Sequence, residues 1–461
     1  FNPWIVPTQP QGRLAKFVER EIRAESAGAT VSNLWETVRD LLQHRGKSKI
    51  LSYTADIYDE PVWIDRESFV EYVTVNDEDA FQYLSVYFNV KDDNHPPLHF
   101  MALHTVSSIF REKISPWMGC GINLILVWGI MIVLMKIGRV CMTIAAHPEA
   151  GRIMGDGAAL LYGLSAGAMS TVLLIRMYAM LTFFCVLLLL VHLKKIYYQD
   201  LGAENFEKRN KALILTTVLG FWTQYFFLFY CLVLALVTAV YLWKWKRRRE
   251  LFCYVRSMVT AAVVGLIFFP FAVSDVFSSG RGVEALQNLS SGLAGYGERL
   301  LAFLRILVQS CGVFCVLGLI LIWIGNGLGK KEARLQRTEL RQKGLWQVLI
   351  LPVAAYFFLA ARMSPFLTDR YVMPIFPLCL LILCFGAVYC LTLWLGKNIG
   401  LWKKVVTIAF VAMAATQPFL PGHSDNDYLY PEYSRQEEIA EEYDGRIKVG
   451  KVNTDEQGEL A

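Results

Sequence analysis

Residues 176–195 read RMYAMLTFFCVLLLLVHLKK, and this stretch decides the fold class. No charged side chain stands between Arg176 and Lys194. A helix of roughly 20 apolar residues crosses a hydrocarbon core about 30 Å thick. The stretch therefore predicts a membrane-spanning helix over 177–194, with an arginine at one boundary and Lys194 and Lys195 at the other.

Other apolar segments of comparable character occur along the chain. They predict further spans at 116–137, 155–173, 212–225, 226–243, 255–275, 300–325, 346–361, 371–396 and 402–420. The stretch 212–243 is too long for one straight helix, so we place a break at Thr223, Gln224 and Tyr225. Residues 98–111 are apolar but short, and we expect a half-inserted or interfacial helix there.

The composition of the chain agrees with a membrane protein. Hydrophobic residues make up 55% of it and charged residues 18%, whereas a soluble globular chain carries about 25% charge. A soluble globular protein, a disordered chain and a collagen-like fibre are therefore excluded. The net charge of +5 comes from short basic blocks between apolar runs, a pattern that gives no reason to expect a nucleic-acid partner.

The basic residues divide unequally between alternate connections. One set of connections holds 23 Lys and Arg side chains, and the opposite set holds only Arg176, Arg281, Arg299, Arg362 and Arg370. The positive-inside rule assigns the basic set to the cytoplasm. We therefore predict an all-α polytopic membrane protein whose five-arginine side is extracytoplasmic.

Polar regions flank the predicted membrane domain of about ten helices at 116–420. Residues 1–115 form a predicted extracytoplasmic first loop with juxtamembrane helices. Within it, the spacing between Arg13 and Arg45 indicates two amphipathic helices that either lie on the membrane or dock onto the protein. Residues 421–461 are predicted as an extracytoplasmic tail that begins a further domain. Ten spans leave both ends on one side, so we expect one more helix before Phe1.

The string KDDNHPPLHF at 91–100 places two carboxyl groups and an imidazole next to each other at the border of the membrane domain. Asp92, Asp93 and His95 stand directly before two prolines, which are tolerated in the first turn of a helix. An aspartate held there could act as a general base toward a hydroxyl or could bind a cation. Alternatively, the Asp or Asn merely caps a helix that begins with proline.

Asp93-x-His95-Pro96-Pro97-Leu98 resembles the Asp-x-His-Pro-Pro-Leu-Tyr-Tyr element of polytopic glycosyltransferases of the GT-C fold. The likeness is strongest to the branch with the protein O-mannosyltransferases, the lipid A aminoarabinose transferases and bacterial family-39 enzymes. Two further strings are similar to that family's later elements: Arg176-Met177-Tyr178-Ala179 to its Arg-x-Tyr element, and Asp369-Arg370-Tyr371-Val372-Met373-Pro374 to its Arg-Tyr-x-x-Pro element.

The resemblance implies a GT-C-like helical bundle in a bacterial plasma membrane. Such an enzyme moves a sugar from a polyprenyl-phosphate donor to a hydroxyl acceptor at the outer face. The family's catalytic base belongs to an acidic pair just after the first membrane helix. Here the pair is expected before Phe1, which leaves Asp59 and Glu60 as substitutes. No cofactor is implied, although a divalent cation could take part, and membrane lipids are the other expected partners.

Arginines and tyrosines of the five-arginine side are the candidate ligands of the donor phosphate. Arg370 and Arg176 offer planar guanidinium forks that match phosphate oxygens, and Tyr371 and Tyr178 could add hydrogen bonds. The alternative for the arginines is pairing with lipid headgroups or with Asp369, which we favour for Arg362. The alternative for the tyrosines is anchoring at the membrane interface.

Two other features leave their interpretations open. Gln224 and Tyr225 would line a substrate cavity if the helix opens at 223–225, but a Gln bonded across helices is an equal alternative. The serine- and glycine-rich connection 274–299 either covers a substrate or is an ordinary loop. We predict no metal site, although His95 and His99 have a spacing that a metal pair could use.

The main rival function is a polytopic transporter or lipid flippase without transferase activity. Transporters place charged groups near the midplane and have related halves. This sequence places its charges at helix ends and has no visible repeat. A second rival is a protein that only binds a lipid-linked sugar.

Overall fold

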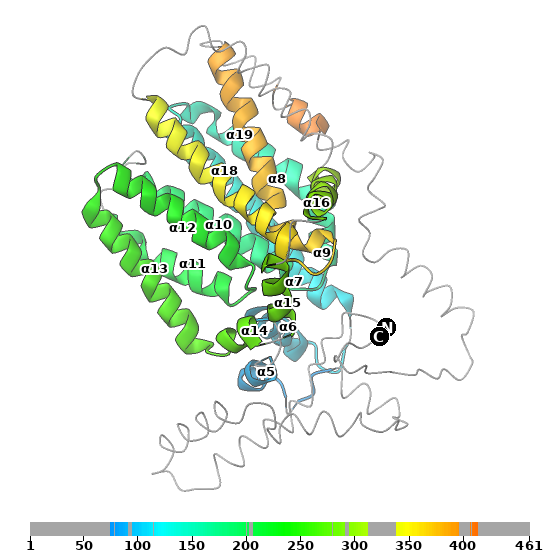
Figure 1. Cartoon of the computed structure of the whole chain (residues 1–461). Coiled ribbons are helices and arrows are strands. Elements are labelled where there is room, and N and C mark those ends of the chain that lie inside the picture. The colour runs from blue at the N-terminus through cyan, green and yellow to red at the C-terminus, as the bar shows by residue number, and fades with distance from the viewer. Residues whose placement is uncertain are drawn as a thin grey trace. The chain divides into compact units, whose positions relative to one another are not determined.

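The computed structural model describes the chain between Thr74 and Met413, with gaps: residues 74–77, 79–90, 95–113, 115–199, 201, 206–278, 280–290, 295–311, 338–395, 406 and 408–413. The regular elements in these residues are helices, and none of them is a strand (Figure 1). The predicted all-α class is therefore confirmed for this part of the chain. The expected amphipathic helices between Arg13 and Arg45 lie outside it.

Within the described residues, six helices contain a stretch long and apolar enough to cross a membrane. These helices are α7 (Pro116–Ile144), α10 (Tyr178–Ile196), α12 (Phe227–Lys244), α13 (Arg248–Phe268), α18 (Thr338–Met363) and α19 (Phe376–Leu395). The molecule is thus built as a multi-pass membrane protein. The break predicted at 223–225 is confirmed, since α11 (Asn210–Phe221) ends before it and α12 begins after it.

The prediction of one span over 155–173 is wrong. The chain there forms α8 (Gly151–Gly163) and α9 (Ala166–Leu173). Ser165 between them has an extended backbone, and its hydroxyl accepts a hydrogen bond from the amide of Ala168 at 3.1 Å. A serine in this position caps a new helix, so the first helix stops.

The predicted span 255–275 also needs correction. Helix α13 begins inside the arginine block at Arg248 and ends at Phe268, because the residue before Pro270 is driven out of the helical region. The connection 274–299 is not a plain loop, since it contains α14 (Ala272–Ser278), α15 (Gly280–Ser290) and the start of α16 (Tyr296–Cys311). The spans predicted at 300–325 and 402–420 lie only partly within the described residues and stay predictions.

The described chain divides into two compact units. The first contains residues 74–90 and 100–119, including α5 (Tyr83–Asn89) and most of α6 (Leu98–Ile109). Inside it, the amide of Phe81 donates to Ser108 Oγ at 2.9 Å, and Arg111 pairs with Asp77. These links fix the segment before α5 on the last turn of α6.

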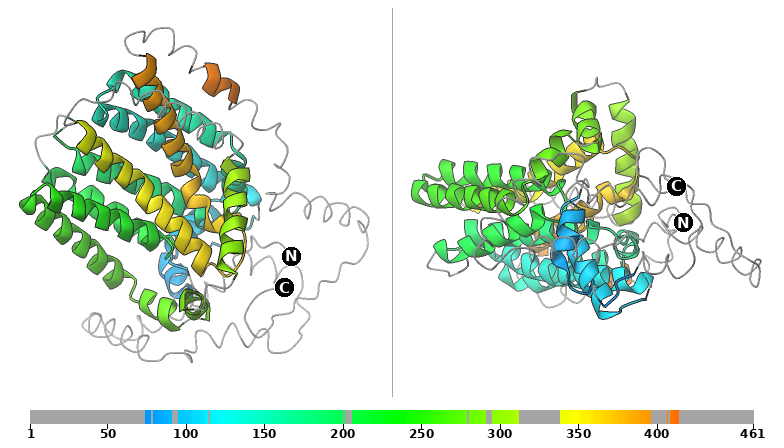
Figure 2. Two further views of the ribbon diagram at one scale, coloured as in Figure 1. Left: turned by 45° about the horizontal axis from the view of Figure 1, so that its top comes forward. Right: turned by 90° about the horizontal axis from the view of Figure 1, so that it is seen from below.

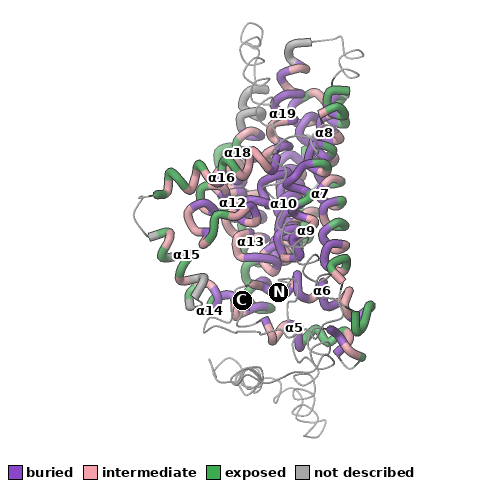
Figure 3. Tube along the Cα trace, turned by 90° about the vertical axis from the view of Figure 1, so that its right-hand side faces the viewer, coloured by how far each residue is buried: buried purple, intermediate pink, exposed green. Residues whose placement is uncertain are grey.

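The second unit contains the described residues 95–99 and those between 120 and 413, and its helices form a bundle arranged around α10. Of the apolar stretch of α10, 78% is buried, against 28% for α13. Most residues of α10 are buried, and α10 lies in the purple centre of Figure 3. Helices α12 and α13 pack side by side (Figure 2). Helices α12 and α13 therefore turn an apolar face outward, as lipid-facing helices do.

Successive connections of this bundle gather alternately at its two ends. At one end, Tyr178 at the start of α10 packs on Tyr371, which also contacts Phe226. We call this the carboxylate end, because it also holds Asp275 and Asp369. At the opposite end, which we call the basic end, Lys195 of α10 bonds to Asn210 of α11. This alternation is the one that the basic residues predicted.

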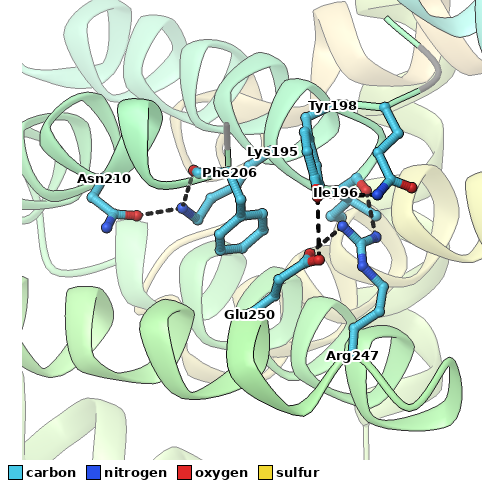
Figure 4. A network of polar contacts seen from close by, with 8 residues as sticks. Lys195, Ile196, Tyr198, Phe206, Asn210, Arg247 and Glu250 are labelled. Carbon is cyan, nitrogen blue, oxygen red and sulfur yellow. Dashed lines mark hydrogen bonds and ion pairs between the residues drawn. The ribbon is translucent and has the colours of Figure 1, made fainter. Parts of the chain in front are cut away.

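At the basic end, Lys195 connects α10 with the segment around Phe206 and with the start of α11 (Figure 4). The side chain is almost fully buried, its ammonium donates to the carbonyl of Phe206 at 3.2 Å and to Asn210 Oδ1, and it lies 3.7 Å from the centroid of the Phe206 ring. Acceptors and an aromatic face compensate the charge for its lost hydration. Helix α10 is thereby tied to the start of α11.

Arg247, directly before α13, ties the start of that helix to the end of α10. Its guanidinium donates to the carbonyl of Ile196 at 2.8 Å, forms an ion pair with Glu250 and lies 5.3 Å from the Tyr198 ring centroid. The Tyr198 hydroxyl donates to Glu250 at 3.3 Å (Figure 4). These contacts fix the basic end, so the opposite helix ends are held at a defined spacing.

Helices α7 and α8 cross at glycines. A Cβ added to Gly155 would lie 2.6 Å from the carbonyl oxygen of Met135, and one added to Gly151 would lie 2.9 Å from the Cα of Arg139. Small residues let helix backbones approach closely without a hydrophobic driving force in lipid. The crossing sets the direction of α8, and therefore the position of Ser170 in the following helix α9 at the carboxylate end.

Candidate functional site

The break between α11 and α12 is a junction of the carboxylate end. The carbonyl of Trp222 accepts from the amide of Leu98 at 3.1 Å, and the indole of Trp222 donates to the carbonyl of Gly265 at 3.1 Å. These bonds satisfy backbone groups that the helix breaks leave open. The start of α6, directly after His95 and the two prolines, is therefore held against the break.

The polar residues predicted at the break are both bonded within the protein. The Tyr225 hydroxyl donates to Asp275 Oδ2 at 2.5 Å, and Gln224 Oε1 accepts from the amide of Tyr225 at 2.6 Å. Asp275 of α14 is buried. The Tyr225 contact joins α14 to the break. Gln224 and Tyr225, which were expected to line a cavity, are thus hydrogen-bonded to other groups of the protein.

A second buried carboxyl belongs to the turn before α19. Here the 3-10 helices η3 (Asp369–Tyr371) and η4 (Met373–Ile375) lead into the span. Asp369 is 4% exposed, and its Oδ2 accepts from Ser170 Oγ of α9 at 2.5 Å. Burial raises the pKa of Asp369 to about 7, although the Ser170 bond, the Arg370 amide and the Arg370 charge each act to lower it. This carboxyl therefore titrates near neutral pH.

Arg370 is half-buried next to this acid. Its guanidinium lies 5.0 Å from the Tyr371 ring centroid and 5.6 Å from that of Phe366, and it donates to the Tyr371 hydroxyl at 3.3 Å. Two rings within cation–π range help to hold the Arg370 side chain in place, and its planar fork suits two oxygens of one anion.

Aromatic rings join the three predicted elements. The Tyr371 ring meets Tyr178 edge-on at 6.1 Å and Phe226 at 5.4 Å between centroids. Such pairs contribute about 0.5–1.5 kcal/mol each beyond their burial. The turn before α10, the break at 222–226 and the turn before α19 thus form one cluster at the carboxylate end.

Arg176 and His99 lie near each other at this end. Burial, together with the nearby His95 and Arg176, lowers the pKa of His99 to about 4. The imidazole of His99 is neutral at pH 7. The turn that carries Arg176 is fixed by Asn123, whose amide donates to the carbonyls of Val172 at 3.1 Å and Leu174 at 2.7 Å.

Two further arginines of this side, Arg299 and Arg362, have local partners. Arg299 donates to the carbonyl of Ala361 at 3.0 Å and to Ser364 Oγ at 3.1 Å, which ties α16 to the end of α18. Arg362 lies 5.3 Å from the Tyr296 ring centroid and donates to the carbonyl of Leu289 at 3.4 Å. Both join helices of this end.

The structure brings together most of the described candidates. Arg176, Tyr178, Gln224, Tyr225, Arg370 and Tyr371 lie at the carboxylate end, and the backbone bond of Leu98 places His95 there as well. Asp59, Glu60, Asp92 and Asp93 lie outside the described residues, and their roles stay predictions. Among the described residues, no group of three or more His, Cys, Asp or Glu could hold a metal ion.

Sequence reasoning missed two residues of this cluster as candidates. Ser170 has no sequence signal, because its role depends on an acid 199 positions away. Asp369 stands beside Arg370, and the sequence indicates only an ion-pair partner for that arginine. An acid next to an interfacial arginine and inside an apolar context is the signal that could have drawn attention to it.

Comparison with known proteins gives no further guide: no protein family matches the chain, and no curated protein or solved structure is detectably similar to it.

Proposed function

We propose that this protein is a membrane glycosyltransferase that moves a sugar from a polyprenyl-phosphate donor to a hydroxyl acceptor at the carboxylate end. The observation that carries the proposal is the meeting of Arg370, Asp369 and Tyr371 with the Arg176–Tyr178 turn at one end of an apolar helical bundle. The motif resemblance to GT-C glycosyltransferases supports it.

The electrostatics of this end suit a lipid-linked phosphate. Such a donor places its tail among lipids and its anionic phosphate at the membrane boundary. Arg370 in η3 and Arg176 just before α10 both lie at the carboxylate end, where the phosphate would bind. A guanidinium fixed in a site of low dielectric constant stabilises the charge that develops on a departing phosphate. Because that charge grows along the reaction, the arginine lowers the barrier as well as binding the donor.

The reaction is a displacement at the anomeric carbon. A carboxylate, for which Asp93 is the candidate, takes the proton of the acceptor hydroxyl as its oxygen forms a bond to that carbon. The bond from the carbon to the phosphate oxygen breaks, and the oxygen keeps the electron pair. The products are the glycosylated acceptor and polyprenyl phosphate. The site of attack is opposite the leaving group, so the sugar configuration inverts.

The test is sugar transfer in proteoliposomes from a panel of radiolabelled polyprenyl-phosphate hexoses and pentoses, with a bacterial membrane extract as acceptor pool. Arg370→Gln and Asp93→Asn should each lower transfer by about 100-fold or more. Arg362→Gln is the matched control and should retain transfer, because the Arg362 guanidinium donates to the carbonyl of Leu289 and lies over the Tyr296 ring.

Two results would contradict the proposal. If no donor is consumed by the wild-type protein, the transferase assignment fails. If the protein moves the lipid across the bilayer without transfer, and Asp93→Asn leaves that movement intact, the chain is a flippase.

A further inference from the structure

Asp369 differs from an ordinary ion-pair partner because only one of its carboxyl oxygens is bonded. Oδ2 accepts from Ser170, whereas Oδ1 is buried and has no hydrogen-bond partner among the described residues. An oxygen deprived of both water and partners is costly unless it carries a proton or meets a ligand. The Oδ1 atom therefore marks a position where a ligand or a proton completes the structure.

The surroundings of Asp369 contain little charge to keep it ionised. Arg370 is the charged residue of the described chain whose field acts on this carboxyl. Helix α16, which packs against η3, carries Glu298, Arg299 and Arg305, and the guanidinium of Arg299 is already bonded to Ala361 and Ser364. Helix α9 and η4 contribute no charged side chain. Burial thus outweighs the stabilising neighbours, in agreement with the raised pKa of Asp369.

We propose that Asp369 is a catalytic general acid, whose Oδ1 hydrogen bonds to the donor phosphate and protonates the leaving oxygen. This inference rests on the proposed function and names a further catalytic residue for it. As the bond from the anomeric carbon to the phosphate oxygen breaks, the oxygen takes the electron pair and then the proton of Asp369. The Asp369 carboxylate that results is stabilised by Ser170 and by Arg370.

The acidities of the two partners match this role. The leaving group is a phosphate monoester, whose second pKa is about 6, and a general acid works best when its own pKa lies near the operating pH. The bound phosphodiester is negatively charged and raises the pKa of a neighbouring carboxyl further. Asp369 is thus protonated when the donor is bound, and it gives its proton to the phosphate oxygen as the bond from that oxygen to the anomeric carbon breaks.

The experiment is the pH profile of sugar transfer by the wild-type protein and by Asp369→Asn, in the proteoliposome assay. In the wild type, kcat/KM should fall as the pH rises above about 7, because the free protein must be protonated at Asp369. Asp369→Asn keeps the shape of the side chain but cannot give up a proton. It should lower kcat by about 100-fold, with KM nearly unchanged, and should abolish this alkaline fall.

Ser170→Ala provides a second variant that does not remove the acid. Loss of the Ser170 hydrogen bond destabilises the ionised carboxylate, so the alkaline fall should move to higher pH. Thr171→Val is its control, because Thr171 on the same helix donates to the carbonyl of Gly167 and its loss should leave the profile unmoved. A purely structural Asp369 would make Asp369→Asn and Ser170→Ala lower stability without moving the pH profile.

A readout independent of turnover is the carboxylic C=O band in infrared spectra of the wild type minus Asp369→Asn. The band should disappear as the pH rises through about 7. If Asp369→Asn transfers sugar with the wild-type rate and pH profile while Arg370→Gln does not, the general acid is refuted and the transferase stands. If the wild type transfers no sugar, both proposals are refuted together.

Discussion

Replacing Gly155 by alanine tests the crossing of α7 and α8, on which the position of Ser170 depends. A Cβ at Gly155 would lie 2.6 Å from the carbonyl oxygen of Met135 and 2.9 Å from its Cα, against 3.4 Å for an ordinary contact. Both atoms belong to the backbone, so no side chain can rotate away. The two helices must separate by most of an ångström to admit one methyl group.

Two opposing effects set the magnitude. Alanine is a better helix former than glycine by about 1 kcal/mol, and overpacking a tight contact costs about 1–3 kcal/mol, or more when backbone has to move. We expect Gly155→Ala to destabilise the protein by about 2 kcal/mol. Gly121→Ala is the matched control, because a Cβ there would meet nothing within 4 Å, and it should stabilise α7 slightly.

The assay is thermal unfolding in detergent, followed by a dye that fluoresces on reaction with thiols. Cys141, Cys185 and Cys231 are buried and become reactive only when the bundle opens. Gly155→Ala should lower the apparent Tm by about 4 °C, and Gly121→Ala should raise it or leave it unchanged. If the two variants are equally stable, the helices do not cross at Gly155 and the argument for the position of Ser170 fails.

Three further predictions concern the basic end, the aromatic cluster and pH. Glu250→Gln breaks the half-buried ion pair with Arg247 and should cost about 2–3 kcal/mol in the thiol assay. Phe226→Ala removes a ring from Tyr371 and should cost about 2 kcal/mol and weaken transfer, whereas Phe226→Leu should recover most of the stability. The pKa of His99 is lowered to about 4 in the folded protein. Between about pH 4 and 6.5, His99 is therefore protonated in the unfolded chain and neutral in the folded one. Its contribution to stability should be full above pH 6.5 and fall toward pH 4, and His99→Gln should remove that loss.

Hydrophobic length and charge asymmetry predicted much of the fold. The apolar runs around 116, 177, 226, 346 and 371 form helices, because no other structure satisfies the backbone in hydrocarbon. The errors fall where local chemistry overrides length. Ser165 caps a second helix inside an apolar run, and Pro270 ends α13 early. The spacing of apolar residues alone does not indicate where either helix ends.

The candidate site was predictable only in part. Arg176, Tyr178, Arg370 and Tyr371 could be placed on one side, since alternating spans bring alternate connections together. The Ser170–Asp369 contact could not be predicted, because it joins segments whose distance depends on packing of α8 and α9. Ring contacts and buried acids are set by tertiary structure, which a reading of charges along the chain does not contain.

The central claim is that Arg370 holds a lipid-linked phosphate at the carboxylate end. Its most direct test is the binding of polyprenyl phosphate to the purified protein in lipid nanodiscs, measured for the wild type, Arg370→Gln and Arg362→Gln. Loss of a charge-assisted, bidentate contact should weaken binding at least about tenfold in Arg370→Gln and leave Arg362→Gln near the wild type. Equal affinity in all three proteins would contradict the claim.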